Sequence, residues 1–310
     1  MFKDLFYFLV YPGFLFISIV GGVLSWFDRK VTAMVQFRKG PPFLQPFYDF
    51  LKLLLVKETI LPEKGSKMTF LIAPVFAVCG ATVAGVLILL PLLDIRAGFS
   101  GDIIVIFYLL TIPSLCYMIG ALASGNPLAS VGASREIKLV ISYELTFLLV
   151  ITGIILKSDM SISLTEVIAS QSEYGAIIGS LPGIILFIAA VFCLQAKLGL
   201  VPFDMAEAET EINHGSFIEY SGSAYAIIKL TKYMMLFILP LFVVALFMGG
   251  FNWQGIHILW SVVKVLAVVL ILTLVRNTSP RVKVKQAMRF FFLWMNLLAV
   301  IAIIMIIFEL

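Results

Sequence analysis

The stretch VPFDMAEAETEINHGSFIEYSG, residues 201–222, concentrates acidic side chains in a strongly apolar chain. Five of the 18 acidic residues of the chain lie in it: Asp204, Glu207, Glu209, Glu211 and Glu219. The same stretch carries apolar side chains, among them Val201, Phe203, Met205, Phe217 and Ile218. A solvated acidic loop is the simplest interpretation, but the mixture of acids and large apolar residues favours a segment that packs against the rest of the chain.

The composition around this acidic stretch is that of a membrane protein. The chain has 310 residues, a mean hydropathy of +1.08 and only 13% charged residues. Soluble globular chains carry about 25% charge. Several apolar runs approach the roughly 20 residues that a helix needs to cross a bilayer. We therefore predict an all-α, polytopic membrane protein that forms one integral membrane domain over residues 1–310.

The apolar runs predict eight transmembrane helices. Their expected ranges are 6–26, 70–93, 103–123, 136–156, 181–200, 224–248, 257–276 and 287–308. The first run is read as a retained helix, because no small-residue cleavage site of a signal peptide follows it. An even number of spans places both termini on the same side of the membrane.

The basic residues are distributed unequally between the two sides. The loops at 27–69, 124–135, 201–223 and 277–286 share one side, and the first of them alone holds eight Lys and Arg residues. The other side offers only Lys3, Arg96 and Lys157. The positive-inside rule then places the basic loops and the acidic stretch in the cytoplasm and both termini outside.

The first basic loop contains an amphipathic segment at about residues 44–57. Its apolar side chains recur at helical spacing: Phe47, Phe50, Leu51, Leu54 and Leu55. The segment is too short and too charged to span the bilayer, so we predict an amphipathic helix that lies in the membrane interface. It could serve as a membrane anchor or as the floor of a cavity that a partner covers.

Several charged residues fall inside the predicted spans. Glu144 and Lys264 lie deep in their segments, where insertion of a charge costs about 2.5–3.5 kcal/mol, so each is expected to face the protein interior or water. They could form structural ion pairs or belong to a relay for protons or other ions. Glu136, Lys229 and Lys232 lie nearer the helix ends, where the lysines could instead extend towards water.

The spacing of the acids in residues 201–222 is that of one helical face, if the segment is helical. Asp204, Glu207 and Glu211 would share one of its faces and Glu209 would point elsewhere. Closely grouped carboxylates repel one another, so we expect raised and coupled pKa values, with a proton shared among several groups. Asp204 could alternatively cap a helix N-terminus.

The residues that commonly bind metals do not form a recognisable site. Cys79, Cys116 and Cys193 all lie in apolar runs and lack the C-x-x-C spacing of iron–sulfur or zinc sites. His214 and His257 are far apart in the sequence. We therefore expect no metal or other cofactor in this chain.

Four segments resemble those of a known family. The residues LVPFDMAEAETEINHGSFIEYSG are similar to the P-F-D-x-x-E-A-E-x-E-x-x-x-G-x-x-x-E-Y-S-G signature of the H subunit of respiratory complex I. Further similarity lies in RKGPPFLQPFYDFLKLLLVKE, ASREIKLVISYEL and RNTSPRVKVKQ, so that the matches extend from residue 38 to residue 286. The family also includes the corresponding subunits of membrane-bound nickel–iron hydrogenases and of related ferredoxin-dependent complexes.

The resemblance implies a subunit without an active site of its own, in the plasma membrane of a prokaryote. Such a subunit joins a cytoplasmic redox arm to antiporter-like membrane subunits within the bilayer and binds no nucleic acid. The iron–sulfur clusters, and in a hydrogenase the nickel–iron centre of the large subunit, would belong to these cytoplasmic partners. Electron transfer, driven by ferredoxin, would be coupled to translocation of protons or sodium ions.

The resemblance also assigns roles to residues of this chain. Glu144, together with Glu207, Glu209, Glu211 and Glu219, would line a channel between a chamber below the redox arm and the polar axis of the membrane arm. From their charges alone we add Asp204, Glu136 and Lys264 to this ion or proton pathway. The chamber and the interface with the redox arm would include Arg38, Gln45, Asp49, Lys52, Lys57, Glu58 and Arg281.

Two departures favour the hydrogenase-like branch. Complex I homologues usually carry an extra stretch before the L-Q-P element, whereas here residues 40–43 run directly into Leu44-Gln45-Pro46. Lys285 also stands where complex I tends to have Asp. We therefore favour protons or a sulfur compound as the electron acceptor, and a quinone-chamber subunit of an NADH:quinone oxidoreductase is the alternative. A stand-alone transporter that uses Glu144 and Lys264 is less favoured, because no inverted repeat is evident.

Overall fold

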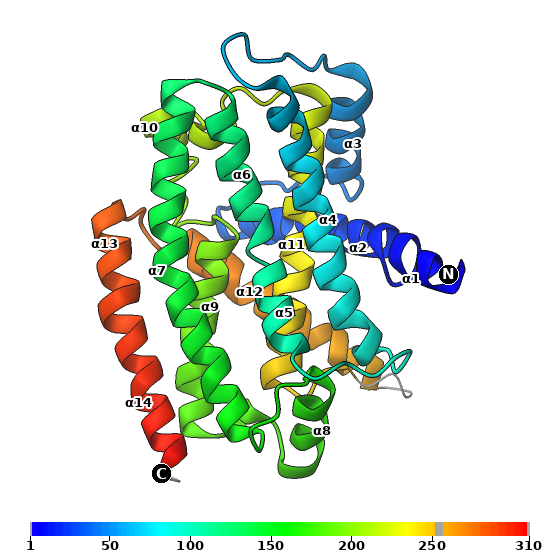
Figure 1. The fold of residues 1–310 in the computed structure, drawn as a ribbon, viewed down its shortest axis with the longest axis vertical. Coiled ribbons are helices and arrows are strands. Elements are labelled where there is room, and N and C mark those ends of the chain that lie inside the picture. The colour runs from blue at the N-terminus through cyan, green and yellow to red at the C-terminus, as the bar shows by residue number, and fades with distance from the viewer. Residues whose placement is uncertain (1, 252–256, 309–310) are drawn as a thin grey trace.

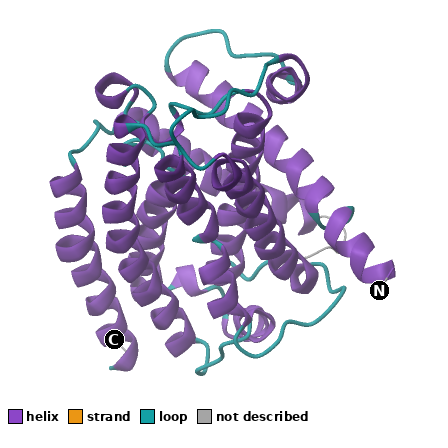
Figure 2. Cartoon of the chain, turned by 45° about the horizontal axis from the view of Figure 1, so that its top comes forward, coloured by secondary structure: helices purple, strands orange, loops and turns teal. Residues whose placement is uncertain are grey.

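Every regular element that the structure describes is a helix. The computed structural model describes residues 2–251 and 257–308, without the side chains at positions 2, 209, 210 and 257. Within these ranges it contains no β-strand, and Figure 2 shows helices connected by loops. The all-α prediction is confirmed.

The helices follow one another along the chain with short connections (Figure 1). The α-helices are α1 (Phe2–Leu9), α2 (Phe14–Val35), α3 (Gln45–Leu51), α4 (Lys67–Leu92), α5 (Asp102–Leu109), α6 (Ile112–Ala123), α7 (Pro127–Lys157), α8 (Leu164–Tyr174), α9 (Leu181–Lys197), α10 (Glu209–Ile212), α11 (Gly222–Phe247), α12 (His257–Thr278), α13 (Val284–Arg289) and α14 (Asn296–Ile307). Short 3₁₀ segments occupy η2 (Ile177–Gly179) and η3 (Gly215–Phe217), and π-helical segments occupy η1 (Lys52–Val56) and η4 (Phe290–Met295).

The number of membrane-spanning segments agrees with the prediction. Within the described residues, seven helical segments are long and apolar enough to cross a bilayer, and α9 adds a shorter apolar helix of 17 residues. The prediction placed the start of α7 at residue 136, but the helix begins at Pro127. Asn126 caps it by accepting a hydrogen bond from the Leu128 amide at 2.8 Å, and Pro127 suits the first helical turn, where its missing N–H is not needed.

Two of the predicted spans are interrupted. The first is divided into α1 and α2 by a turn that contains Pro12 and Gly13. The third is divided into α5 and α6 at Leu110–Thr111, and Pro113 lies in the first turn of α6. Proline cannot donate a backbone hydrogen bond to the preceding turn, so a helix breaks before it more readily than after it.

Helix α11 lies at the centre of the bundle. It packs against α2, α4 and α12, and Figure 1 shows it behind α5 and α6. Of the 18 most apolar consecutive residues of α11, 89% are buried, because the helix is apolar around its whole circumference. Gly21 allows α2 to approach it closely, since a Cβ there would lie 2.3 Å from the Tyr233 carbonyl oxygen.

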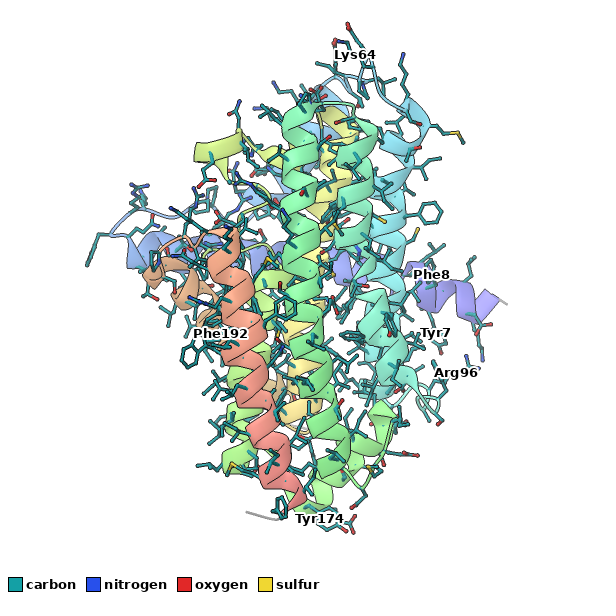
Figure 3. The ribbon with its side chains drawn as sticks, turned by 60° about the vertical axis from the view of Figure 1, so that its left-hand side comes forward. Tyr7, Phe8, Lys64, Arg96, Tyr174 and Phe192 are labelled. Atoms are coloured by element: carbon teal, nitrogen blue, oxygen red, sulfur yellow. The ribbon has the colours of Figure 1, made fainter. Side chains whose placement is uncertain are left out.

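The acidic stretch and the later part of the first basic loop gather at one end of the bundle, whereas the loop before α13 lies nearer the middle of its length (Figure 1). Figure 1 shows α3, α10 and the loop before α4 at that end, and α8 and the C-terminus at the opposite end. In Figure 3, Lys64 and Tyr174 mark the two ends. The assignment of the Lys64 end to the cytoplasm stays a prediction from the charge pattern.

The amphipathic segment predicted at 44–57 is helical, as α3 and η1. The structure adds α8, which lies between two predicted spans and was not itself predicted. The Gln171 side chain fixes α8 to the C-terminal end of α11. Its amide nitrogen donates to the Ala245 and Leu246 carbonyls at 3.0 and 3.1 Å. Its amide oxygen accepts from the Gly249 N–H at 2.8 Å.

Candidate functional site

The acidic stretch, residues 201–222, is a folded loop rather than a helix. Residues 201–208 form turns, α10 is a single helical turn, and Ala208, Asn213 and His214 have positive φ angles. The shared face that a helix would have given these acids is therefore not formed. The chain turns back on itself at Gly215, where the Ser216 amide donates to the Ala206 carbonyl at 3.3 Å, and a Cβ on Gly215 would lie 2.0 Å from that oxygen.

The same loop is packed against the bundle, as its apolar residues indicated. Its buried side chains are Phe203, Met205, Ile212, Phe217 and Tyr220. Helix α7 makes room for it at Gly132, where a Cβ would lie 2.5 Å from the Ser216 amide nitrogen. Tyr220 stacks on Phe70 of α4 with ring centroids 4.0 Å apart and donates to the Phe70 carbonyl at 3.1 Å.

Each described carboxylate of the loop has a polar partner on a different part of the bundle. The pairs are Asp204 with Arg281 at 2.7 Å, Glu207 with Lys232, Glu211 with Arg135 at 2.7 Å, and Glu219 with the Asn126 amide at 2.5 Å. The side chain of Glu209 lies outside the described part of the chain. Individual partners thus offset the repulsion that we had expected a shared proton to relieve.

Asp204 binds the segment before α13 instead of capping a helix. Its side chain is 13% exposed and forms its ion pair with Arg281, which lies between α12 and α13. Burial raises the pKa of the Asp204 carboxyl, and the Arg281 guanidinium opposes that shift. The ion pair fastens the acidic stretch to the end of the bundle at which α13 begins.

A small polar cavity lies beneath the acidic stretch. Its titratable lining residues are Glu136 of α7, Lys197 of α9, Lys232 of α11, and Asp204 and Glu207 of the loop, with Tyr117 of α6. The centres of water molecules can occupy about 40 Å³ of it. That space is enough for a few waters, and the lining offers the polar partners that buried water requires.

Lys197 connects this cavity to Glu144, deeper in α7. The Lys197 side chain is fully buried, and its Nζ donates to Glu144 Oε1 at 2.6 Å. Rings of Phe107, Tyr143 and Phe147 surround the ammonium, with centroids 5.3, 5.5 and 5.3 Å from Nζ. Glu144 Oε2 is buried and accepts no hydrogen bond within the described structure.

A second polar cluster joins the surface helix α3 to the bundle. Arg29 of α2 donates to Asp49 at 2.9 Å and to the Tyr233 hydroxyl of α11 at 3.1 Å, and Gln45 donates to Asp49 at 2.8 Å. Burial raises the pKa of the Asp49 carboxyl, but the hydrogen bonds from Arg29 and Gln45 outweigh it, so the pKa is lowered. Gln45 and Asp49 thus lie together, as the chamber hypothesis requires.

The other predicted chamber residues lie at the same end but make fewer contacts. Arg38, Lys57 and Glu58 are exposed in the loops on either side of α3 and η1, and Lys52 is exposed at the start of η1. Arg281 of the same set is 43% exposed in its side chain and pairs with Asp204, at the acidic stretch.

Lys264 is separated from the cavity. Its ammonium donates at 2.6 Å to the carbonyl of Met248, the C-cap residue of α11. The acidic stretch precedes the opposite, N-terminal end of the same helix. A cation at a helix C-terminus is stabilised by the unpaired carbonyls there.

The sequence reading missed two buried ion pairs. Asp28 of α2 accepts from Arg276 of α12 at 2.8 Å and from Thr273 at 2.8 Å. Asp28 had been placed in the first loop, because the first span was expected to end at residue 26 rather than at Val35. Lys197 had not been singled out, because its partner Glu144 is distant in the sequence.

No metal site was found among the described residues. No group of three or more His, Cys, Asp or Glu side chains in that part of the chain could hold a metal ion. Cys79, Cys116 and Cys193 are free thiols.

Comparisons with known proteins point to one family. The family model described as NADH dehydrogenase matches residues 8–307. A relative from Brevibacillus brevis, named as the H subunit of NADH-quinone oxidoreductase, is 32% identical over 295 residues, which cover 89% of this chain and 85% of the relative. One of the same name from Dehalococcoides mccartyi is 30% identical over 304 residues, covering 92% and 80%.

A solved structure shares the fold. It is a chain in the structure of the membrane-bound sulfane sulfur reductase, an archaeal respiratory membrane complex. The two chains superpose with a TM-score of 0.87 at 31% sequence identity, covering 94% of this chain and 96% of the other.

Proposed function

Because this chain belongs to the NADH dehydrogenase family and is a membrane subunit of a complex I-related oxidoreductase, we propose that it couples electron transfer to ion movement. It anchors a cytoplasmic redox arm and helps to move protons or sodium ions across the plasma membrane of a prokaryote. The chain itself contributes no redox centre, and the iron–sulfur clusters belong to its partners.

The observation that carries this proposal is the run of ionisable side chains from the acidic stretch to the membrane interior. Glu207 and Glu136 face the same cavity as Lys197, and Lys197 reaches Glu144. A charged side chain is costly to bury inside a membrane protein. A row of ionisable side chains beside water-sized space is therefore better suited to ion transfer than to stabilising the fold.

The redox arm docks at the end of the bundle that carries α3 and the acidic stretch. Exposed basic side chains at that end, such as Arg38, Lys52 and Lys57, provide a surface for a hydrophilic subunit. The antiporter-like subunits bind within the bilayer. Glu144 is 17% exposed in its side chain, between the buried stripe of α7 and outward-facing Ile141 and Leu145, so a neighbouring subunit can reach it.

We propose reduced ferredoxin as the electron donor, and protons or a sulfur compound as the acceptor. The short connection at residues 40–43 supports this branch. The lengths of the relatives also support this branch. The structural match covers 96% of the sulfane sulfur reductase chain, whereas the sequence matches cover 85% and 80% of the two quinone oxidoreductase subunits.

The second candidate is a subunit that forms the quinone chamber of an NADH:quinone oxidoreductase. The names of the curated relatives favour it, and identity of 30–32% to them does not differ from the 31% to the sulfur reductase chain. Gln45 and Asp49, held together under the loop at residues 40–43, would be the polar residues nearest such a chamber.

The test is to purify the complex through a tag on this chain and to reconstitute it in tight vesicles. Reduced ferredoxin should drive electron transfer to protons or to a sulfur compound, together with ion uptake that an uncoupler abolishes. Turnover with NADH and a quinone alone would establish the second candidate. Electron transfer without ion movement, or isolation of the chain without any iron–sulfur partner, would contradict the proposal.

A further inference from the structure

The buried ammonium of Lys197 is the one cation that links the cavity under the acidic stretch to Glu144 among the described residues. Lys197 is the last residue of α9, and its backbone lies next to Gly199, which lines the cavity and has a φ of +62°. Its side chain lines that cavity on one side and contacts Glu144 on the other. This placement at a helix end, beside water-sized space, gives the four-carbon stem freedom that a residue in mid-helix would lack.

The contacts of the ammonium are incomplete. An ammonium has three N–H donors, and Glu144 Oε1 is the one hydrogen-bond acceptor recorded for Nζ in the described structure. The three aromatic rings supply further stabilisation, because cation–π attraction is strongest where water is excluded. This cage holds the charge only while Glu144 is ionised, since rings alone do not replace the hydration of an ammonium.

The cavity offers a second resting place for the same charge. Glu136 lines it and, among the described residues, has no basic side chain within ion-pair distance, whereas Glu207 is paired with Lys232. Other charged or titratable groups facing this space are Asp204, which Arg281 neutralises, and Tyr117. Glu136 and Glu144 are eight residues apart on α7, a rise of about 12 Å, and Lys197 lines the same cavity as Glu136 while it donates to Glu144.

From these contacts, and resting on the proposed function, we propose that Lys197 is a charge gate that alternates between Glu144 and Glu136. When Glu144 takes up a proton from the side of the antiporter-like subunits, the ammonium loses its counter-charge. It then turns into the cavity and pairs with Glu136, which releases its own proton to cavity water.

The exchange balances in protons and in charge. One proton binds to Glu144, one leaves Glu136, and Lys197 keeps all three of its N–H protons. Before and after the step, the three side chains together carry one negative and one positive charge. A step that creates no net charge avoids the large desolvation cost of an unpaired ion in a low-dielectric interior. The step therefore transfers the ionised state from Glu144 to Glu136, and no proton passes between the three aromatic rings.

Glu144→Gln is the sharpest test, because glutamine mimics a protonated Glu144 and is nearly isosteric. In a structure of the purified complex carrying this change, we expect Lys197 Nζ to leave the three rings and to lie within hydrogen-bond distance of a Glu136 oxygen. Lys197 remaining among Phe107, Tyr143 and Phe147 would overturn the gate and leave the proposed coupling function standing, since that function is tested by ion uptake in the unmodified complex.

An infrared titration of the Glu136 carboxyl gives a second readout that a static ion pair would not change. The Glu136 band is assigned by its loss in Glu136→Gln. In Glu144→Gln, the arriving ammonium should lower the pH at which Glu136 ionises. Adding Lys197→Met should abolish that shift, because methionine retains the buried stem without the charge. An unchanged titration in Glu144→Gln, or an equal shift in the double variant, would contradict the gate.

Discussion

Arg29 of α2 donates to Asp49 of α3 at 2.9 Å, and this ion pair helps to join a helix that crosses the bundle to a helix on its surface. The pair is about one-third exposed, with 32% and 28% of the two side chains accessible. Arg29 also donates to Tyr233 of α11, so its position is fixed by the central helix. The surface helix is thereby placed relative to the acidic stretch, which directly precedes α11.

Replacing Asp49 by Ala should loosen α3 without unfolding the bundle. An ion pair of this exposure contributes on the order of 1 kcal/mol or less, and the spanning helices do not depend on it. Hydrogen exchange of residues 45–56 should accelerate, while exchange in α11 stays unchanged. Lys52→Ala is the matched control, because Lys52 is exposed on the same segment. Equal exchange rates in both variants would show that the pair does not hold the helix.

The docking of α3 should also weaken in acid. The pKa of Asp49 is lowered in the folded protein, so its pairing stabilises the docked helix above the ordinary aspartate pKa and is lost as pH falls through the lowered value. Exchange in residues 45–56 should therefore rise at the acidic end of a pH series. Asp49→Asn should exchange rapidly throughout and lack this pH dependence. A wild-type profile that matches that of the variant would refute the linkage.

Gly132→Ala should displace the acidic stretch from α7. The new Cβ would lie 2.5 Å from the Ser216 amide nitrogen, and backbone cannot move aside as a flexible side chain can. Overpacking of this kind costs about 1–3 kcal/mol, so the yield of assembled complex and its thermal stability should fall. Gly179→Ala is the control, because nothing lies within 4 Å of the Cβ that it adds. Equal stability of the two variants would show that the close approach of Gly132 to the Ser216 amide does not hold the acidic stretch against α7.

The membrane-spanning architecture could be predicted because it depends on the mean hydropathy of long runs, which tertiary contacts do not override. The arrangement of the acidic stretch could not be predicted from the spacing of three carboxylates, because that spacing gives a shared face only in a helix. Local backbone geometry at Ala208, Asn213 and His214, all with positive φ, decided the structure of that segment instead.

The site was only partly predictable for a related reason. The sequence identified the individual charges, such as Glu144 and Glu207, but not their partners, because Lys197 and Lys232 reach them from other helices. Asp28 was overlooked because the end of α2 was misplaced by nine residues, from 26 to 35. Pairing between helices is a property of the assembled bundle, and no local pattern encodes it.

Glu144→Gln should leave the complex assembled but impair ion translocation. The side chain keeps its size, but it can no longer gain or lose a proton. Assembly is measured by the yield of partner subunits on a tag, and transport by ion uptake per electron in tight vesicles. Glu173→Gln on the exposed face of α8 is the control. Normal uptake by an assembled Glu144→Gln complex would leave Glu144 a structural role only.

The acidic stretch should matter more for coupling than for electron transfer. Glu207, Glu211 and Glu219 are each paired with a group from the bundle. A change in the charge of any of them therefore alters a contact with α7 or α11. On the proposed function, an electron that reaches a cluster of a redox arm docked at this end would add negative charge, favour protonation of nearby carboxylates and so release their partners.

Single replacements of these three glutamates by Gln should therefore lower the number of ions moved per electron. The rate of electron transfer in uncoupled membranes should change less, because the proposed redox centres belong to partner subunits. Glu173→Gln again provides the matched control for loss of one carboxylate. If all three variants kept the wild-type ratio of ions to electrons, these three pairs would serve only to hold the loop, and the coupling mechanism would have to reside elsewhere in the complex.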